Sequence, residues 1–303
     1  MASYTIIRQS PTQSGLHMWH FISEQISECI QQDFICDDIR EVKAGESHKA
    51  YKISDGKQHF FVKINEKIHR PNFEAEAEGL EHFRNTHLFK VPKIICTGVV
   101  SDHSFLVLEH ITMTQGDDQN WFHFGQKLAE LHKTHTQEMY GWQQDNFVGL
   151  TPQPNLWQKK WSYFFAEQRI GFMLQLLTEK GHISVNIDAV VEAIKNLLLG
   201  HKPTASMLHG DLWQGNTGFF NHQPVLFDPA LYFGDRETDL AMSELFSRFP
   251  ESFYQGYEDV WPLEANYQYR KPIYQLYHVL NHALLFGGHY LDSAKLTLKN
   301  LDI

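Results

Sequence analysis

Cysteine is scarce in this chain, and long apolar runs are missing from it. The 303 residues include three cysteines, a number too small and odd for the disulfide framework of a small secreted domain: Cys29, Cys36 and Cys96. No apolar run approaches the ~20 residues that cross a bilayer. The first residues also lack the basic and apolar regions of a secretory signal peptide. We therefore expect a soluble cytoplasmic protein with reduced thiols and no membrane partner.

Basic residues are the next scarcity. The chain has 26 Lys and Arg against 36 Asp and Glu, which gives a formal net charge of −10. Non-specific nucleic-acid binding needs a basic face, so this balance argues against a nucleic-acid partner. A cationic amine substrate is compatible with it. The remaining composition, 42% hydrophobic and 20% charged, is typical of a globular protein of one or two domains.

The first third of the sequence has the pattern of a small sheet with helices. An amphipathic helix is predicted over residues 17–31, whose apolar side chains recur at helical spacing. Alternating or apolar segments predict four strands, at 39–45, 49–54, 59–65 and 104–111. Between the third and the fourth strand, residues 73–85 have one apolar helical face. This part of the chain is expected to form a first, N-terminal domain over residues 1–111.

Beyond residue 113 the pattern changes to long helices. Helical segments are predicted at 121–135, 157–177, 187–199 and 267–301, the last one despite two adjacent glycines. The change in pattern predicts an α+β fold and a second, mainly helical domain over residues 112–303. No internal repeat or low-complexity segment interrupts it.

Two polar motifs follow apolar segments in this second domain. HGDLWQGN occupies residues 209–216, and DPALYFGDRETDLA begins at Asp228. Phosphoryl transfer needs one carboxylate beside the attacking hydroxyl, and oxygen ligands that hold Mg²⁺ against the nucleotide phosphates. The spacing predicts Asp211 as the catalytic base. It predicts Asn216 and Asp228 as the Mg²⁺ ligands.

The same motifs have a purely structural interpretation. Asp, Gly, Asn and Pro all favour turns, so both motifs could be ordinary polar turns. The strand-like segments 206–209 and 224–227 precede the two motifs, however, and three groups fall at the spacing that a kinase needs. We therefore favour the kinase interpretation.

Lys63 lies in the middle of an apolar predicted strand, where an unpaired charge is costly. In a kinase such a lysine binds the α- and β-phosphates and pairs with a helix carboxylate. The alternative is a lysine on an edge strand that faces solvent. Four glutamates in the following helix could be its partner: Glu74, Glu76, Glu78 and Glu81. Glu76 shares a helical face with the apolar Phe73 and Leu80, so it is the predicted partner.

The motifs carry a family resemblance. The chain resembles a bacterial-type member of the fructosamine kinase (ketosamine 3-kinase) family, in the aminoglycoside and choline kinase branch of the protein-kinase-like fold. The matching segments cover nearly the whole chain: HGDLWQGN, FDPALYFGDRETDLAM, TPQPNLWQKKWSYFFAEQRIG, FVKIN and VLEHI. The first is shared by many small-molecule kinases. YFGDRETDLAM and WQKKWSYFFAEQRIG are more specific to the fructosamine kinase branch.

The resemblance implies ATP and Mg²⁺ as cofactors and a two-lobed structure, with a small antiparallel-sheet lobe carrying one key helix and a larger helical lobe. Residues 44–53 stand where the family has its glycine-rich loop, although Gly45 is the one glycine there, and in isolation the segment reads as a plain hairpin turn. The backbone of Glu109, His110 and Ile111 is expected to bind the adenine edge where the lobes join.

In the larger lobe several residues have more than one interpretation. Trp213 could stack on a sugar face or fill core, and Asp235 and Glu237 are candidates to face the substrate. Asp239 is expected to anchor the catalytic loop, and His209 to hydrogen-bond within it. The aromatic residues of the 157–169 helix mostly suit a core, although this helix could also form a wall of the acceptor pocket. Paired histidines at 132 and 135, and at 278 and 282, lack the further ligands of a zinc site, so no zinc is predicted.

The resemblance further implies the reaction. The expected activity is transfer of the ATP γ-phosphoryl group to the 3-hydroxyl of a ketosamine, a ribulosamine or fructosamine unit that is free or attached to a protein lysine. The phosphorylated product would decompose and release the amine, a deglycation repair. A kinase of another small alcohol, such as an aminoglycoside or choline, is the alternative. A nucleotide-binding pseudokinase is a further one, against which the intact Lys63, Asp211, Asn216 and Asp228 argue. The oligomeric state stays open.

Overall fold

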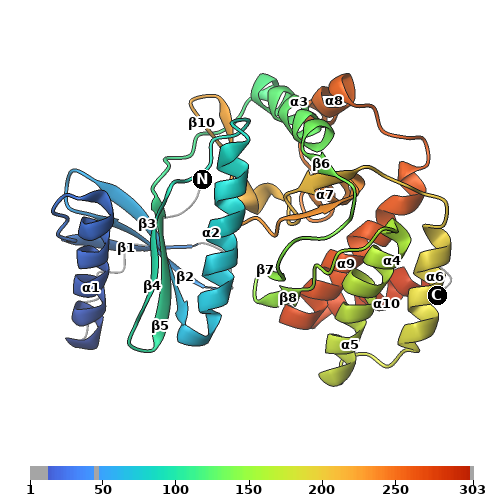
Figure 1. Cartoon of the computed structure of the whole chain (residues 1–303), viewed down its shortest axis with the longest axis horizontal. Coiled ribbons are helices and arrows are strands. Elements are labelled where there is room, and N and C mark those ends of the chain that lie inside the picture. Colours follow the sequence, from blue (N-terminus) through green and yellow to red (C-terminus); the bar gives the residue numbers. More distant parts are fainter. Residues whose placement is uncertain (1–12, 44–47, 301–303) are drawn as a thin grey trace. The chain divides into compact units, whose positions relative to one another are not determined.

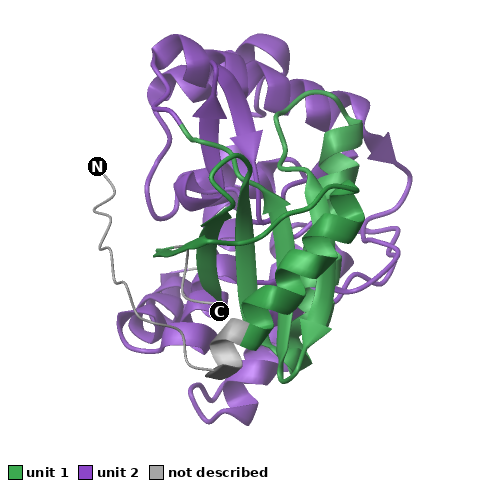
Figure 2. Cartoon of the chain, turned by 90° about the vertical axis from the view of Figure 1, so that its left-hand side faces the viewer, with its two compact units in different colours: residues 1–113 green, residues 114–303 purple. Residues whose placement is uncertain are grey.

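The computed structural model describes residues 13–43 and 48–300. The chain forms two compact units, residues 1–113 and 114–303 (Figure 2). The sequence predicts the boundary between the two domains after Ile111, close to the observed boundary after Met113. Each unit has its own sheet and its own buried core.

The first unit is built on a five-stranded antiparallel sheet. Its strands are β1 (Asp38–Val42), β2 (Lys49–Ser54), β3 (His59–Glu66), β4 (Ile94–Val100) and β5 (His103–Glu109). Their order is β1-β2-β3-β5-β4, so β3 is central. Lys63 lies opposite Ala50 of β2 and opposite Leu106 of β5. The edge-strand alternative for Lys63 is therefore wrong.

Helices cover both faces of this sheet (Figure 1). The predicted N-terminal helix is α1 (Gln13–Ile30), and its buried Trp19, Ile22 and Ile26 pack with Val62 and other apolar strand residues. The predicted second helix is α2 (Arg70–Asn85), which follows a short 3₁₀ turn over Lys67–His69. Because successive strand residues point to opposite faces, the residue after Val62 points away from α1 and toward the face that α2 covers.

Sequence reasoning missed β4. This strand lies at the sheet edge and carries an irregularity between Ile94 and Cys96, where the pairing register shifts. Most of its residues are half-buried, so no alternation of apolar and polar residues marks it. A turn at residues 101–102 joins β4 to β5, with Ser101 in a left-handed conformation at φ 52°.

The second unit is mainly helical. Its longer helices are α3 (Asp118–Thr134), α5 (Phe172–Glu179), α6 (Ile187–Leu197), α8 (Glu251–Val260), α9 (Tyr267–Phe286) and α10 (His289–Asn300). The shorter ones are α4 (Trp161–Phe165), a π-helical stretch over Ala166–Gly171, and α7 (Glu237–Ser243). Helices α3 and α8 pack so closely that a Cβ on Gly125 of α3 would lie 1.9 Å from the carbonyl oxygen of Phe253 on α8.

Two helical predictions need correction. The segment expected to be helical over 157–177 begins only at Trp161 and passes through the π-helical stretch. The tail expected as one helix over 267–301 divides into α9 and α10. Gly287 and Gly288 lie between them with φ of 64° and 54°, a conformation that ends a helix. Helices α7 and α8 were not predicted.

Short strands frame the polar motifs. Strand β9 (Ala205–Leu208) lies between β6 (Thr136–Gln137) and β12 (Tyr232–Gly234) in a three-stranded sheet. Strands β10 (Thr217–Phe220) and β11 (Gln223–Leu226) form a second sheet. Strands β7 (Asn146–Val148) and β8 (Thr151–Gln153) form a third. The strand-like segments 206–209 and 224–227 thus correspond to β9 and β11. Residues 209–216 connect β9 to β10, and Asp228 follows β11. Over residues 13–43 and 48–300, no helix is both long and apolar enough to span a bilayer.

Candidate active site

The loop at 209–216 is held by a carboxylate from α7. Asp239 accepts hydrogen bonds from the backbone N–H of His209 at 2.7 Å and of Gly210 at 2.9 Å. Gly210 has φ 81°, and a Cβ there would lie 2.0 Å from the Ala230 carbonyl oxygen, so only glycine fits. The expected anchoring role of Asp239 is confirmed.

The anchor is itself buried and fully bonded. Burial would raise the pKa of Asp239, but the His132 hydrogen bond and the loop N–H groups hold this pKa below its ordinary value. Asp239 is therefore ionised, and His132 Nε2–H donates to it at 3.2 Å. Burial lowers the pKa of His132, so the neutral ring accepts the Tyr257 hydroxyl at Nδ1, 2.8 Å away. Helices α3, α7 and α8 thus fix the position of the loop.

This arrangement makes Asp239 a stability determinant. We expect Asp239→Ala to lower the free energy of unfolding by about 3 kcal/mol or more, because buried N–H donors lose their acceptor. Urea denaturation followed by circular dichroism measures the change. Asp259→Ala on α8 is the control, since its carboxylate binds Gln126 on the exposed surface and should cost less than about 0.5 kcal/mol. Equal losses in the two variants would contradict the anchoring account.

The proposed base and one proposed metal ligand lie side by side. Asn216 Nδ2 donates to the backbone oxygen and to the Oδ2 atom of Asp211, both at 2.9 Å. The amide nitrogen is therefore engaged, and the amide oxygen is the atom that could bind a metal. The pKa of Asp211 is raised to about 7, mainly by burial and also by the charges of Asp228 and Asp239, while the Asn216 hydrogen bond acts in the opposite direction. A bound cation would lower this pKa again.

Asp228 has a strained backbone. Its φ is 54°, a conformation that non-glycine residues rarely adopt and that is frequent at functional sites. The preceding residue, Phe227, is held by two backbone hydrogen bonds. Its N–H donates to the Asn216 carbonyl oxygen at 3.2 Å, and its carbonyl oxygen accepts from His209 Nε2 at 3.0 Å. The side chains of Asn216 and Asp228 offer an amide oxygen and a carboxylate, which are hard oxygen donors of the kind that suits Mg²⁺.

His209 uses both ring nitrogens inside the loop. Its Nδ1 accepts the Asp211 N–H at 3.3 Å, so its Nε2 is the donor to Phe227. The ring is completely buried, and this burial lowers its pKa. His209 is therefore a structural residue, as expected, and not a second base.

In the first unit the predicted lysine–glutamate pair is present. Lys63 Nζ lies 2.7 Å from Glu76 Oε1, and their side chains are 3% and 13% exposed. The other three glutamates of α2 lie on the outer side of the helix: Glu74 binds Arg70, Glu81 binds Arg84 and Glu78 lies 4.0 Å from His82. The helix register inferred from Phe73 and Leu80 is correct.

The proposed adenine-binding segment ends β5. The Glu109 carboxylate accepts from Lys90 Nζ at 2.7 and 2.9 Å and from the Lys93 N–H at 3.1 Å. Its side chain is thus engaged within the first unit, and any contact with adenine would come from the backbone of Glu109, His110 and Ile111. Gly45 lies outside the described residues.

Asp235 and Glu237 are buried in an ion network. Asp235 accepts from the Tyr274 hydroxyl at 2.6 Å and faces His201 Nε2 at 2.7 Å. Glu237 accepts two hydrogen bonds from Arg270, at 2.7 and 2.6 Å. Both carboxylates are at most 2% exposed. These contacts connect Asp235 and Glu237 to α9. A place facing the substrate stays a prediction for both residues.

The same network contains a possible cation-binding group. Among the described residues, ligand atoms of His201, Asp235 and Glu237 lie within 4.8 Å of one another. The Arg270 guanidinium already supplies the positive charge at Glu237, at 2.6 Å. The hydrogen bonds above therefore account for this cluster without a metal.

Trp213 contributes to a partly exposed aromatic surface in the second unit. Its ring meets Phe246 edge-on with centroids 6.3 Å apart, and Phe246 in turn lies 4.3 Å from the His282 ring. Tyr290 of α10 packs 5.1 Å from His282. All four rings are half-buried. Trp213 is thus neither fully buried in core nor isolated, and stacking on a sugar stays a prediction.

Residues 157–171, the segment WQKKWSYFFAEQRIG, include a buried arginine. Arg169 in the π-helical stretch is completely buried, donates to Asn155 Oδ1 at 2.7 Å and stacks on Tyr232 with its guanidinium 4.2 Å from the ring centre. Tyr277 of α9 lies on another side at 5.6 Å. These side chains form core, so the predicted role of this helix as an acceptor wall is not supported by them.

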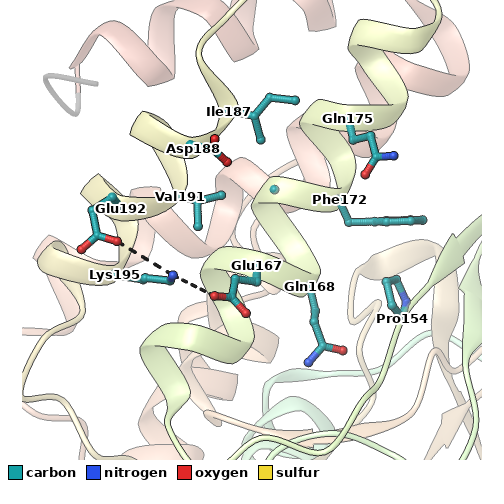
Figure 3. Close-up of a pocket in the computed structure, with 11 residues that line it drawn as sticks. Pro154, Glu167, Gln168, Phe172, Gln175, Ile187, Asp188, Val191, Glu192 and Lys195 are labelled. Carbon is teal, nitrogen blue, oxygen red and sulfur yellow. Dashed lines mark ion pairs between the residues drawn. The ribbon is translucent and has the colours of Figure 1, made fainter.

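A cavity of about 540 Å³ lies on another side of this helix, against α6 (Figure 3). Its lining residues are Pro154, Glu167, Gln168, Gly171, Phe172, Gln175, Ile187, Asp188, Val191, Glu192 and Lys195. Lys195 Nζ binds Glu167 at 2.7 Å there. The cavity contains none of the predicted catalytic, metal-binding or nucleotide-binding residues, so it is a separate feature of the second unit.

His278 is the residue beside the proposed base that sequence reasoning missed. Its Nδ1 lies 3.7 Å from Asp211 Oδ1. The sequence presented His278 only as one of a histidine pair on a helix, because no local pattern connects α9 to the loop at 209–216. Only the folded second unit brings the two side chains together.

Comparisons with known proteins agree on one family. The family model described as fructosamine kinase matches residues 18–302. The chain is 47% identical over 285 residues to a protein of Vibrio parahaemolyticus named "Probable ketoamine kinase", covering 94% of this chain and 99% of that protein. The same name is given to an Escherichia coli protein that is 44% identical over 285 residues.

Solved structures show the same fold. A structure titled as a "Putative fructosamine-3-kinase" of Haemophilus somnus matches with a TM-score of 0.88 at 36% identity, covering 92% of this chain and 96% of that one. An aminoglycoside phosphotransferase in complex with ADP and hygromycin B matches with a TM-score of 0.60 at 14% identity, covering 93% and 96%. The second likeness concerns the protein-kinase-like fold alone.

Proposed function

The chain belongs to the fructosamine kinase family, and on that premise we propose that it transfers the γ-phosphoryl group of ATP to the 3-hydroxyl of a ketosamine. It is a phosphotransferase with an alcohol group as acceptor. The observation that carries the proposal is the hydrogen-bonded pair of Asp211 and Asn216 beside Asp228, in a chain 47% identical to a protein named "Probable ketoamine kinase". The finer assignments below are supported by the geometry of each unit.

Asp211 is the proposed base. The acceptor oxygen attacks the γ-phosphorus as the bond from phosphorus to the ADP oxygen breaks, and the hydroxyl proton passes to the Asp211 carboxylate. The pKa of this carboxyl, raised by burial to about 7, suits a group that must accept and then release a proton near neutral pH. Asn216 supports this role because its amide holds Asp211 Oδ2 in place.

Asn216 and Asp228 are the proposed ligands of Mg²⁺. When bound, the metal ion neutralises charge that develops on the phosphates. The Phe227 N–H bond to the Asn216 carbonyl oxygen links the chain next to Asp228 to Asn216, and Asp228 itself has a backbone conformation that non-glycine residues rarely adopt. These two residues would therefore orient the nucleotide by holding the metal ion with their oxygen atoms, while Asp211 accepts the proton.

Lys63 is the proposed ligand of the α- and β-phosphates. Its charge is buried in the central strand, and Glu76 supplies the compensating charge at 2.7 Å. A lysine held in this way has its ammonium group fixed in direction. Glu109, His110 and Ile111 are proposed to contact adenine through their backbone.

Substitution of Glu76 tests the proposed role of Lys63, with substitution of Glu78 as the control. We expect Glu76→Ala to lower kcat/KM for ATP by about 10- to 100-fold, because the buried lysine loses its orienting charge. Glu78→Ala is the matched control, as this glutamate lies 4.0 Å from His82 at the surface and should stay near wild type. Steady-state kinetics with varied ATP measures both. A larger loss for Glu78→Ala would contradict the proposed role of Glu76.

The acceptor is proposed to be a ketosamine, free or on a protein lysine, whose sugar stacks on the exposed part of Trp213. Two observations support it: the aromatic surface begins two residues after Asp211, and the net charge of −10 suits a cationic amine. Elimination of the 3-phosphate as inorganic phosphate would leave an unsaturated imine of the sugar. Water would hydrolyse this imine to the free amine and a dicarbonyl sugar, a deglycation reaction. We propose that it occurs in the cytoplasm.

A panel of alcohols separates this function from its alternatives. ADP release is measured with fructoselysine, ribuloselysine, a glycated protein, choline and an aminoglycoside. The proposal predicts turnover with at least one ketosamine at a kcat/KM at least about 10²-fold above that of the other alcohols. Preference for choline or the aminoglycoside would establish the alternative kinase. Nucleotide binding without turnover of any acceptor would indicate a pseudokinase.

A further inference from the structure

His278 on α9 presents a buried polar atom to the catalytic loop. The residue is 4% exposed, and its Nδ1 lies 3.7 Å from Asp211 Oδ1. Within residues 13–43 and 48–300, this Nδ1 has no hydrogen-bond partner. Native proteins satisfy nearly all buried polar atoms, so an unsatisfied one beside a catalytic carboxylate needs an explanation.

The ring of His278 is a neutral donor. The pKa of His278 is lowered to about 3, mainly by burial and also by His282 and Arg169, while Asp239 acts in the opposite direction. A neutral imidazole carries one N–H. With the proton on Nε2, the Nδ1 lone pair would face the oxygen of the ionised Asp211, which is repulsive. The carboxylate therefore favours the tautomer with the proton on Nδ1.

We propose that His278 is a positioning residue for the catalytic carboxylate of Asp211. When substrates are bound, the Nδ1–H of His278 donates a hydrogen bond to Asp211 Oδ1. This inference rests on the proposed role of Asp211. The distance of 3.7 Å must shorten by less than about 1 Å to become a hydrogen bond, and catalytic hydrogen bonds are often long in free enzymes. Asn216 would then hold Oδ2 and His278 would hold Oδ1.

A neutral donor suits this position better than a cation. The two hydrogen bonds prevent rotation of the carboxylate about its Cβ–Cγ bond, so one lone pair stays aimed at the acceptor hydroxyl. A lysine or arginine in place of His278 would instead hold the carboxylate in its ionised form and make it a weaker base. The imidazole orients Asp211 while adding no charge to the site.

Three substitutions distinguish a hydrogen bond from simple space filling. The amide nitrogen of asparagine stands the same number of bonds from Cα as histidine Nδ1, whereas that of glutamine corresponds to Nε2. His278→Asn therefore keeps a donor beside Asp211, His278→Gln moves it away, and His278→Leu removes it. Single-turnover and steady-state kinetics are measured for each variant, together with ATP affinity and the unfolding temperature.

We expect kcat to fall while ATP binding is kept. His278→Leu and His278→Gln should lower kcat by about 10- to 100-fold, since misplacement of a catalytic group by ~1 Å costs this much. The KM for ATP should stay within about threefold of wild type, because His278 has no proposed contact with the nucleotide. His278→Asn should recover most of the lost kcat. Should His278→Leu fail to fold, the Asn and Gln variants still decide the question.

Leu280→Ala on the same helix controls for destabilisation. Leu280 is completely buried and apolar, so its truncation should lower the unfolding temperature while kcat stays close to wild type. A kcat as low in His278→Asn as in His278→Leu would overturn the proposal, and so would wild-type kcat in all three His278 variants. If the wild-type enzyme prefers a different alcohol, the proposed substrate is wrong, yet the same comparison on that alcohol still tests His278.

Discussion

Asp211→Asn is expected to reduce kcat by at least ~10²-fold and to leave ATP affinity close to that of the wild type. The amide cannot accept the proton of the acceptor hydroxyl. The shape of the side chain is kept, and the catalytic loop stays anchored by Asp239 through His209 and Gly210. The loss should therefore appear in the chemical step, which rapid-quench single-turnover kinetics measures directly.

Two controls make the Asp211 result specific. Calorimetric titration with Mg-ATP should give a dissociation constant within about threefold of wild type, since Asp211 is not a proposed metal ligand. Asp259→Asn, an exposed carboxylate change on α8, should leave kcat unchanged. Retention of more than about a tenth of wild-type kcat in Asp211→Asn would remove this residue from the role of base.

Asp228→Ala is expected to weaken the binding of Mg-ATP itself. The carboxylate is proposed to bridge the protein to the phosphates through the metal, so its loss should raise the dissociation constant by about 10-fold or more. The measurement is calorimetry with a non-hydrolysable ATP analogue in the presence of Mg²⁺.

Chelation of the metal provides the control for Asp228. With EDTA in place of Mg²⁺, wild type and Asp228→Ala should bind the nucleotide about equally, because the missing interaction requires the ion. Unchanged affinity of the variant in Mg²⁺ would refute the assignment. A loss of the same size in EDTA would show that Asp228 supports the loop rather than the metal, through its strained backbone position.

The parts of the site that could be predicted are those encoded locally. Asp211 and Asn216 lie in one loop of eight residues, 209–216, and their spacing alone indicates that they can meet. Glu76 was identified because residues three and four apart share a helical face, and its 2.7 Å contact with Lys63 follows from that register. The anchoring of the loop by Asp239 likewise comes from a nearby motif.

The parts that escaped prediction depend on distant segments. His278 approaches Asp211 only because α9 packs inside the second unit. Asp235 and Glu237 resembled substrate ligands in the sequence, since their partners Tyr274 and Arg270 belong to the same distant helix. Strand β4 was missed for another reason: a register shift and partial exposure remove the alternation by which a strand is recognised.

The position of the transferred phosphate tests the central claim most directly. The wild-type enzyme is incubated with Mg-ATP and fructoselysine, and the product is analysed by two-dimensional ¹H–³¹P NMR. We expect one new phosphate ester, coupled to the proton on carbon 3 of the sugar, with ADP equal in amount to this ester plus the inorganic phosphate that its elimination releases. A phosphate on any other oxygen, or ADP formed without a sugar phosphate, would contradict this claim.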